Sequence, residues 1–150
     1  MRRKEKEITE EPAIEAIIKK SLVCRLALSD DNTPHIVPLS FGYKDKVLYF
    51  HGSQKGKKID IIKKNPKVCF EFDVNTEIVK AEDACHWSMK YQSVIGFGKA
   101  VLIEDTNEKR KALSIIMSQY SDGPFEFDDA ILKKTFVIKV EIESMTGKQS

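Results

Sequence analysis

The chain has no long hydrophobic run, few cysteines and little net charge, and each shortage excludes a class of protein. No apolar stretch approaches the roughly 18 residues that a membrane-spanning helix needs, so we expect no membrane partner. No hydrophobic segment follows the basic start of the chain, so the sequence predicts no secretory signal. The formal net charge is only +2, which argues against nucleic acid as the main partner.

The three cysteines are an odd number without paired spacing. Cys24 and Cys69 stand inside apolar runs and are interpreted as small core residues. Cys85 lies beside His86, but two adjacent ligands without a second pair do not predict a zinc site, so we expect no bound metal. These thiols favour a reducing, cytoplasmic location.

The composition is that of an ordinary globular protein, with 41% hydrophobic and 32% charged residues among 150. A chain of this length buries roughly 70% of its unfolded surface, so it forms one core without a disulfide or a metal. The sequence contains no internal repeat and no linker. We therefore expect a single domain over residues 1–150, with residues 1–8 as a flexible tail.

Alternation of apolar and polar residues predicts about six strands. They are expected over residues 21–29, 35–43, 47–51, 67–74, 91–104 and 136–142. The links between the first three are too short for a parallel crossover, so these strands are antiparallel. Three or four short helices complete the chain. The predicted fold class is mainly β with short helices, and a barrel is favoured over a flat sheet because closure removes exposed edges.

The most informative segment runs from residue 49 to residue 59, where a predicted strand ends and a helix begins at once. Its glycines and polar residues include Gly52, Ser53, Gly56, Lys57 and Lys58. A helix start has unpaired N–H groups and partial positive charge, which attract anions. The segment is not a Walker loop, because Lys58 stands where that motif requires Ser or Thr. It is interpreted either as a phosphate site or as a solvated turn with surface lysines.

Two further segments have features suited to a planar ligand. Pro38 interrupts the strand over residues 35–43, which leaves backbone groups free for a heterocycle edge, or which marks a plain edge strand or bulge. Trp87 is the only tryptophan and stands in an irregular stretch. It is interpreted as a stacking wall or interface residue, or as an aromatic plug at the end of the core.

Together these segments resemble the FMN-binding split-barrel superfamily of pyridoxamine phosphate oxidase, and within it the nitroimidazole-resistance (Nim) proteins. The resemblance extends over residues 22–120. The matching runs are Pro34–Pro38, Leu48–Ser53 with Gly56–Lys58, Asn65–Phe70 and Tyr91–Gly98. The chain lacks the arginine-rich substrate pattern of a true pyridoxamine phosphate oxidase, so the resemblance does not imply vitamin metabolism.

The resemblance implies a six-stranded antiparallel split β-barrel and a homodimer with one FMN at each of two sites between subunits. It assigns the phosphate to Ser53 and Lys58 with help from Lys57, inside the run from His51 through Gly52 and Gly56. It assigns the flavin ring to Pro38, Leu39 and Ser40, with His51 near it. By the same resemblance, Trp87, Tyr91 and Ser93 close the site from the partner subunit.

Three functions remain open at this point. The first is a reductase that passes electrons from NADH or NADPH to a small acceptor such as a nitro-aromatic compound or a quinone, with His51 exchanging protons. The second is a non-catalytic flavin-binding protein. The third is a haem-binding split barrel, for which only His35, His51 and His86 offer an imidazole. The phosphate-binding features favour FMN over haem.

Overall fold

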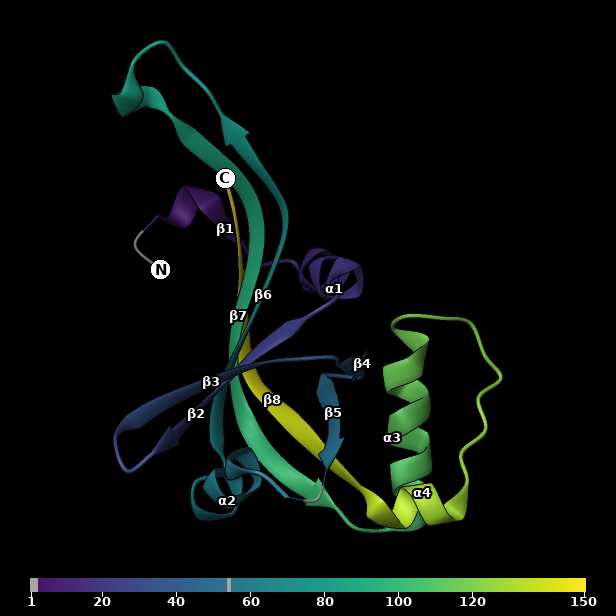
Figure 1. Cartoon of the computed structure of the whole chain (residues 1–150). Helices are drawn as coiled ribbons and strands as arrows, with labels where there is room; N and C mark the ends of the chain where they lie inside the picture. The colour runs from purple at the N-terminus through teal and green to yellow at the C-terminus, as the bar shows by residue number, and fades with distance from the viewer. Residues whose placement is uncertain (1–2, 54) are drawn as a thin grey trace.

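The computed structural model describes residues 3–53 and 55–150, and these form one antiparallel sheet with helices packed around it (Figure 1). The strands are β1 (Glu7–Ile8), β2 (Cys24–Asp30), β3 (Thr33–Leu39), β4 (Gly42–Lys44), β5 (Val47–Ser53), β6 (Lys67–Val79), β7 (Ser88–Ile103) and β8 (Thr135–Gln149). The α-helices are α1 (Glu11–Lys20), α2 (Lys57–Lys64), α3 (Thr106–Ser118) and α4 (Asp129–Lys134). Short 3₁₀ helices cover Lys4–Lys6 and Ala84–His86.

The sheet runs in the order β3-β2-β6-β7-β8-β5-β4, with β1 added to β8. Its two end strands, β3 and β4, are consecutive in the chain and are joined through Ser40 and Phe41. The sheet therefore curves back toward its own beginning, as a barrel does. This architecture confirms the predicted antiparallel split barrel. All six predicted strands are present, while β1 is additional and β4 separates from the strand predicted over residues 35–43.

The core lies inside the curved sheet and consists of the inward-facing residues of each strand. Phe50, Phe70 and Phe72 are fully buried, and so is Phe41 on the link between β3 and β4. The ring centroids of Phe41 and Phe72 are 4.8 Å apart. The helices α1 and α2 close the core with apolar faces, through Ile14, Ile17, Ile18, Ile59, Ile61 and Ile62. This burial matches the period-two and period-3.6 patterns of the sequence.

The start of the chain departs from the flexible tail predicted over residues 1–8. Glu7 and Ile8 form β1, and Ile8 is opposite Gly147 of β8. A side chain at Gly147 would place its Cβ 2.8 Å from the Cβ of Ile8, so the glycine is what allows this close approach. Lys6 Nζ also donates to the Ser150 hydroxyl at 2.6 Å. Residues 4–8 therefore have regular structure that the sequence did not predict, because pairing with a distant strand leaves no local pattern, and residues 1–2 of the predicted tail lie outside the described residues.

The cysteines divide between core and surface. Cys24 is fully buried, as expected, and burial raises the pKa of its thiol well above the ordinary range. Cys69 is half-buried and lies on the outer face of β6, since its neighbours Val68 and Phe70 point into the core. All three cysteines are free.

The hairpin of β6 and β7 continues far beyond the rest of the sheet, as the upper part of Figure 1 shows. We call residues 75–91 the arm. Its strands remain paired, with Ile78 opposite Met89 after a register shift between Val74 and Glu77.

Among the described residues, no helix is long and apolar enough to cross a membrane.

Candidate functional site

The segment between β5 and α2 has the strand-end and helix-start arrangement that the sequence predicted. β5 ends at Ser53 and α2 begins at Lys57, with Gly56 as its N-cap residue in an extended conformation. No described side chain caps the first N–H groups of α2. The Ser53 hydroxyl donates to the carbonyl of Lys55 at 2.9 Å and so holds the loop. An uncapped helix start with a free positive end favours an anion.

Lys58 lies against the end of β5. A Cβ built on Gly52 would be 3.2 Å from Lys58 Nζ and 3.5 Å from its Cε, so the ammonium fills the space that a side chain at Gly52 would take. Around Gly56, by contrast, a Cβ would meet no described atom within 4 Å. Lys57 is exposed and Lys58 half-buried. Lys57 and Lys58 make this end of the strand positively charged.

The end of β3 lies at the same end of the β4–β5 pair as His51. Gly42 of β4 is opposite Tyr49 of β5. Ser40 is two residues before Gly42, and His51 is two residues after Tyr49 in the antiparallel partner strand. Leu39 is opposite Cys24 and half-buried. The ring residues predicted at Pro38, Leu39 and Ser40 thus come shortly before β4, the strand that pairs with β5.

Pro38 is opposite Arg25 in β2, and β3 has no described partner strand except β2. It therefore lies in an edge strand, one of the arrangements that the sequence predicted for this proline. His51 is exposed on the outer face of β5, where its paired residue in β8 is Val137.

The remaining predicted site residues are on and beside the arm, far from α2 (Figure 1). Trp87 is 49% exposed, and its indole N–H donates to the carbonyl of Ala81 at 2.8 Å. Tyr91 pairs with Ser150 through its backbone, and Lys148 Nζ lies 5.6 Å from the centroid of its ring. Within a single chain, Trp87, Tyr91 and Ser93 are therefore distant from the β5–α2 loop.

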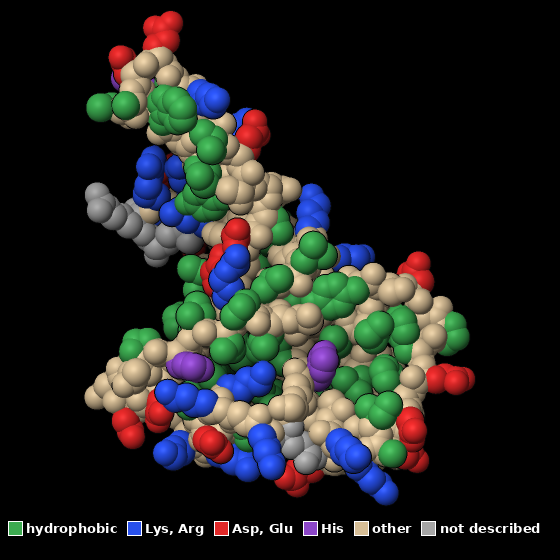
Figure 2. Space-filling view, viewed as in Figure 1, with side chains coloured by type: hydrophobic (Ala, Val, Ile, Leu, Met, Phe, Trp, Pro, Cys, Tyr) green, Lys and Arg blue, Asp and Glu red, His purple; other side chains and the backbone are tan. Residues whose placement is uncertain are grey.

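The outer face of the sheet carries a row of apolar side chains. Ladder pairing aligns Ile36, Ala27, Cys69 and Phe97 across four strands. Ile36 is 62% and Phe97 55% exposed, and Ile95 in the adjoining row is also exposed. Because alternate residues of a strand share a face, Tyr91 and Ser93 lie on this same side of β7. Figure 2 shows apolar side chains in green along the arm and Lys or Arg in blue at the lower end of the molecule, around α2.

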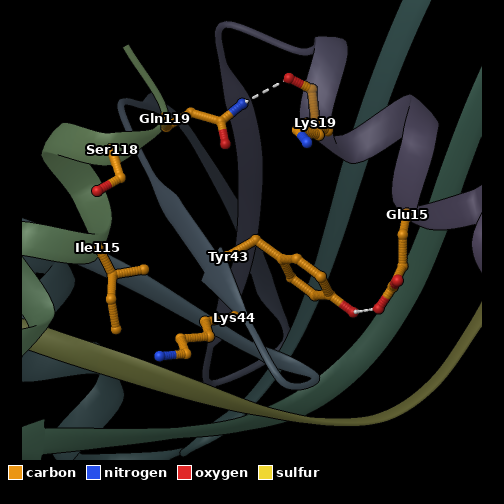
Figure 3. Close-up of a pocket in the computed structure, with 7 residues that line it drawn as sticks. All are labelled: Glu15, Lys19, Tyr43, Lys44, Ile115, Ser118 and Gln119. Carbon is orange, nitrogen blue, oxygen red and sulfur yellow. Dashed lines mark hydrogen bonds between the residues drawn. The ribbon is translucent and has the colours of Figure 1, made fainter. Parts of the chain in front are cut away.

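A separate cavity of about 500 Å³ lies between α1, β4 and α3 and contains none of the predicted site residues. Tyr43 forms one wall and donates a hydrogen bond to Glu15 Oε1 at 2.8 Å (Figure 3). Burial, together with this bond to Glu15, raises the pKa of Tyr43 well above its ordinary range. No local motif indicates this cavity, because the residues that line it come from three separate elements.

Residues 3–53 and 55–150 contain no group of three or more His, Cys, Asp or Glu side chains placed to hold a metal ion. His86 Nδ1 lies 3.6 Å from Asp83 Oδ2, and both side chains are exposed.

Comparison with known proteins places this architecture in a family. The model of the pyridoxamine 5'-phosphate oxidase family matches residues 10–149. A crystal structure of a candidate 5-nitroimidazole antibiotic resistance protein from Bacteroides thetaiotaomicron VPI-5482 is 35% identical. The match covers 95% of this chain and 86% of that chain with a TM-score of 0.87. A search of the curated proteins finds no match.

Two more distant structures share the fold. The flavocytochrome Anf3 from Azotobacter vinelandii is 19% identical over 100% of this chain and 72% of that chain, with a TM-score of 0.88. The FAD and heme binding protein from Mycobacterium smegmatis is 20% identical over 97% of this chain and 73% of that chain, also with a TM-score of 0.88. At these identities the likeness concerns the fold alone.

Proposed function

Because the chain belongs to the pyridoxamine 5'-phosphate oxidase family, we propose that it binds FMN and passes electrons from NADH or NADPH to a small acceptor. The observation that carries this proposal is the ammonium of Lys58 held against Gly52, beside the uncapped start of α2. A nitro-aromatic compound or a quinone is the class of acceptor that we propose.

The residues of the β5–α2 loop fit a phosphate. Lys57 and Lys58 form no ion pair with a described carboxylate, so both ammonium groups are available to an anion. The first N–H groups of α2 add partial positive charge. The Ser53 hydroxyl, which now donates to Lys55, is a third donor within the same loop. Space beside Gly56 lets a phosphate approach the backbone.

The ring of the flavin is assigned to the end of β3 and to His51. Pro38 has no N–H to donate, and Ser40 is exposed immediately after β3. Bound FMN supplies the capacity to accept a hydride and release electrons, while the protein orients it. An imidazole exchanges protons near neutral pH, so we assign this role to His51, which is exposed on the outer face of β5.

A second copy of the chain is part of the proposal. The apolar outer row, Tyr91 and Ser93 lie on one side of the sheet, where a symmetry-related copy would cover them, and Trp87 is exposed on the adjoining arm. Such an interface would let the arm of one subunit approach the β5–α2 loop of its partner. We expect a homodimer that buries well above roughly 1,000 Å² in total. A monomeric mass by light scattering for flavin-loaded protein would contradict it.

We also propose a cytoplasmic location. Three free cysteines, one of them exposed at Cys85, are compatible with a reducing compartment.

An anaerobic stopped-flow experiment tests the reductase. We expect NADH or NADPH to bleach the flavin band of the loaded protein, and a nitro-aromatic compound or quinone to restore it. His51→Ala should slow this cycle more than it weakens FMN binding, while His35→Ala on β3 serves as the matched control. A flavin that stays oxidised with either nicotinamide, yet is reduced by dithionite, would overturn the reductase and leave a flavin-binding protein. A Soret band in the purified protein would instead indicate haem.

A further inference from the structure

The cavity between α1, β4 and α3 is distinct from the proposed FMN site, and we propose that it binds a small aromatic carboxylate. Its volume of about 500 Å³ is within the range of small-molecule sites. The side chains that line it are Glu15, Lys19, Tyr43, Lys44, Ile115, Ser118 and Gln119. Figure 3 shows Lys19 and Lys44 on different sides of the cavity, with the Tyr43 ring between them.

The walls of the cavity are fixed to one another by hydrogen bonds. Gln119 Nε2, at the end of α3, donates to the carbonyls of Ile18, Lys19 and Ser21 at 3.3, 3.1 and 2.8 Å. Tyr43 binds Glu15 and so ties β4 to α1. At Gly42 a Cβ would lie 2.6 Å from the backbone nitrogen of Ile116, so the glycine lets α3 pack directly on β4. A site whose walls are already held loses little freedom when a ligand binds.

The lining combines an apolar surface with unpaired positive charge. The Tyr43 ring and the Ile115 side chain, both half-buried, provide area for a planar ring. Lys19 and Lys44 form no ion pair with any described residue, whereas the neighbouring Lys46 is paired with Glu11 at 3.1 Å. Glu15 is engaged by the Tyr43 hydroxyl, which stays protonated because its pKa is raised. The Glu15 carboxylate keeps its negative charge, but the two lysines outnumber it, so the cavity lining carries a net positive charge.

Two helices end at this cavity, and the partial negative charge of their C-termini would oppose an anion if their carbonyls were free. At the end of α1, Ser21 Oγ donates to Ile17 at 2.9 Å, and Gln119 satisfies the next carbonyls. At the end of α3, the N–H groups of Tyr120 and Ser121 both donate to Met117 at 3.0 Å. These bonds reduce the opposing field and leave the lysines as the dominant charges.

Amide NMR on the ¹⁵N-labelled full chain tests this site with benzoate as the probe. We expect saturable shifts at Tyr43, Lys44 and residues 115–119, and none at residues 51–58. Benzyl alcohol keeps the ring without the charge, and acetate keeps the charge without the ring, so both should bind at least about threefold more weakly. Lys19→Ala and Lys44→Ala should each weaken benzoate about two- to fivefold, and the double variant more than tenfold.

Lys20→Ala is the matched control, because Lys20 is exposed on the same helix but does not line the cavity. It should leave the affinity for benzoate unchanged. The proposal is overturned if benzoate causes no saturable shift around the cavity, or if Lys20→Ala weakens binding as much as Lys19→Ala. Equal binding of benzyl alcohol would show an apolar cavity without charge recognition and would also overturn it. None of these outcomes depends on whether the chain binds FMN.

Discussion

The strands β6 and β7 run through both the arm and the rest of the sheet, which we call the body. Their apolar residues have opposite surroundings in the two regions. In the body, Phe70 and Phe72 face the core and are fully buried. In the arm, Ile78, Trp87 and Met89 are all exposed by 45% or more. The hydrogen-bonded ladder continues through both regions, so pairing alone does not explain why the arm carries apolar side chains.

The difference indicates that the body is stable by its own packing, whereas the arm exposes an apolar surface, which our proposal assigns to a second copy of the chain. Exposed apolar patches in folded proteins commonly mark interaction surfaces. Trp87 is held in place by its bond to Ala81, and Lys80 Nζ lies 6.0 Å from its ring centroid. Its position is fixed before any partner arrives, which suits a residue that closes a shared site.

The largest effect on stability is expected in the body. Phe70→Ala removes a fully buried ring that packs against Phe72 at a centroid distance of 5.9 Å. Large-to-small changes of this kind cost about 3–5 kcal/mol because they leave a cavity. Urea unfolding followed by circular dichroism measures the change. A loss below about 1 kcal/mol would show that the body does not depend on this core.

A smaller effect is expected from the buried thiol at Cys24. Its pKa is raised in the folded protein by burial, so above the ordinary value of 9.0 the unfolded chain loses a proton that the folded chain keeps. The stabilising contribution of the protonated thiol is therefore fully present below about pH 9. At higher pH, the free energy of unfolding decreases by about 1.4 kcal/mol per pH unit. Urea unfolding of Cys24→Ala between pH 9 and 10.5 should no longer show this decrease in the free energy of unfolding with pH.

Cys85, exposed within the arm's 3₁₀ helix, provides the comparison with the body. Cys85→Ala should show the same decrease in the free energy of unfolding with pH as the unaltered chain. If the two alanine variants flatten the slope equally, burial of Cys24 is not its cause.

The smallest effect on folding is expected from Trp87→Ala in the arm. Because half of this side chain is already exposed, the free energy of unfolding should change by less than about 1 kcal/mol. Self-association should weaken at least tenfold, since aromatic anchors dominate interfaces. Sedimentation measures the association, and Trp87→Phe should retain most of it. Unchanged association in Trp87→Ala would remove the arm from the proposed interface.

The sequence predicted the body better than its surroundings. Alternation at Val68, Phe70 and Phe72 located the first part of β6. No strand was predicted between residues 74 and 91, because a strand without a buried face has no apolar period to detect. Pairing of Ile8 with Gly147 was missed for a related reason, since only the tertiary structure brings these residues together.

The candidate site was predictable where it is local in sequence. The run from His51 to Lys58 follows a strand end into a helix start, and the structure has that arrangement. The contact of Lys58 Nζ with Gly52 could not be read from spacing, because it depends on how the helix turns back on the strand. The cavity around Tyr43 was not predicted at all, since its three walls are distant in the sequence.

The affinity for FMN of Lys58→Ala compared with Lys55→Ala tests the central claim most directly. Both lysines are close in sequence and carry the same charge, but only Lys58, in the first turn of α2, lies against Gly52. Quenching of FMN fluorescence during titration measures both dissociation constants. Loss of one charge-assisted contact costs about 1.5–3 kcal/mol, so Lys58→Ala should weaken binding about ten- to a hundredfold while Lys55→Ala does much less. Equal weakening by the two substitutions, or no saturable binding of FMN to the unaltered chain, would contradict the claim.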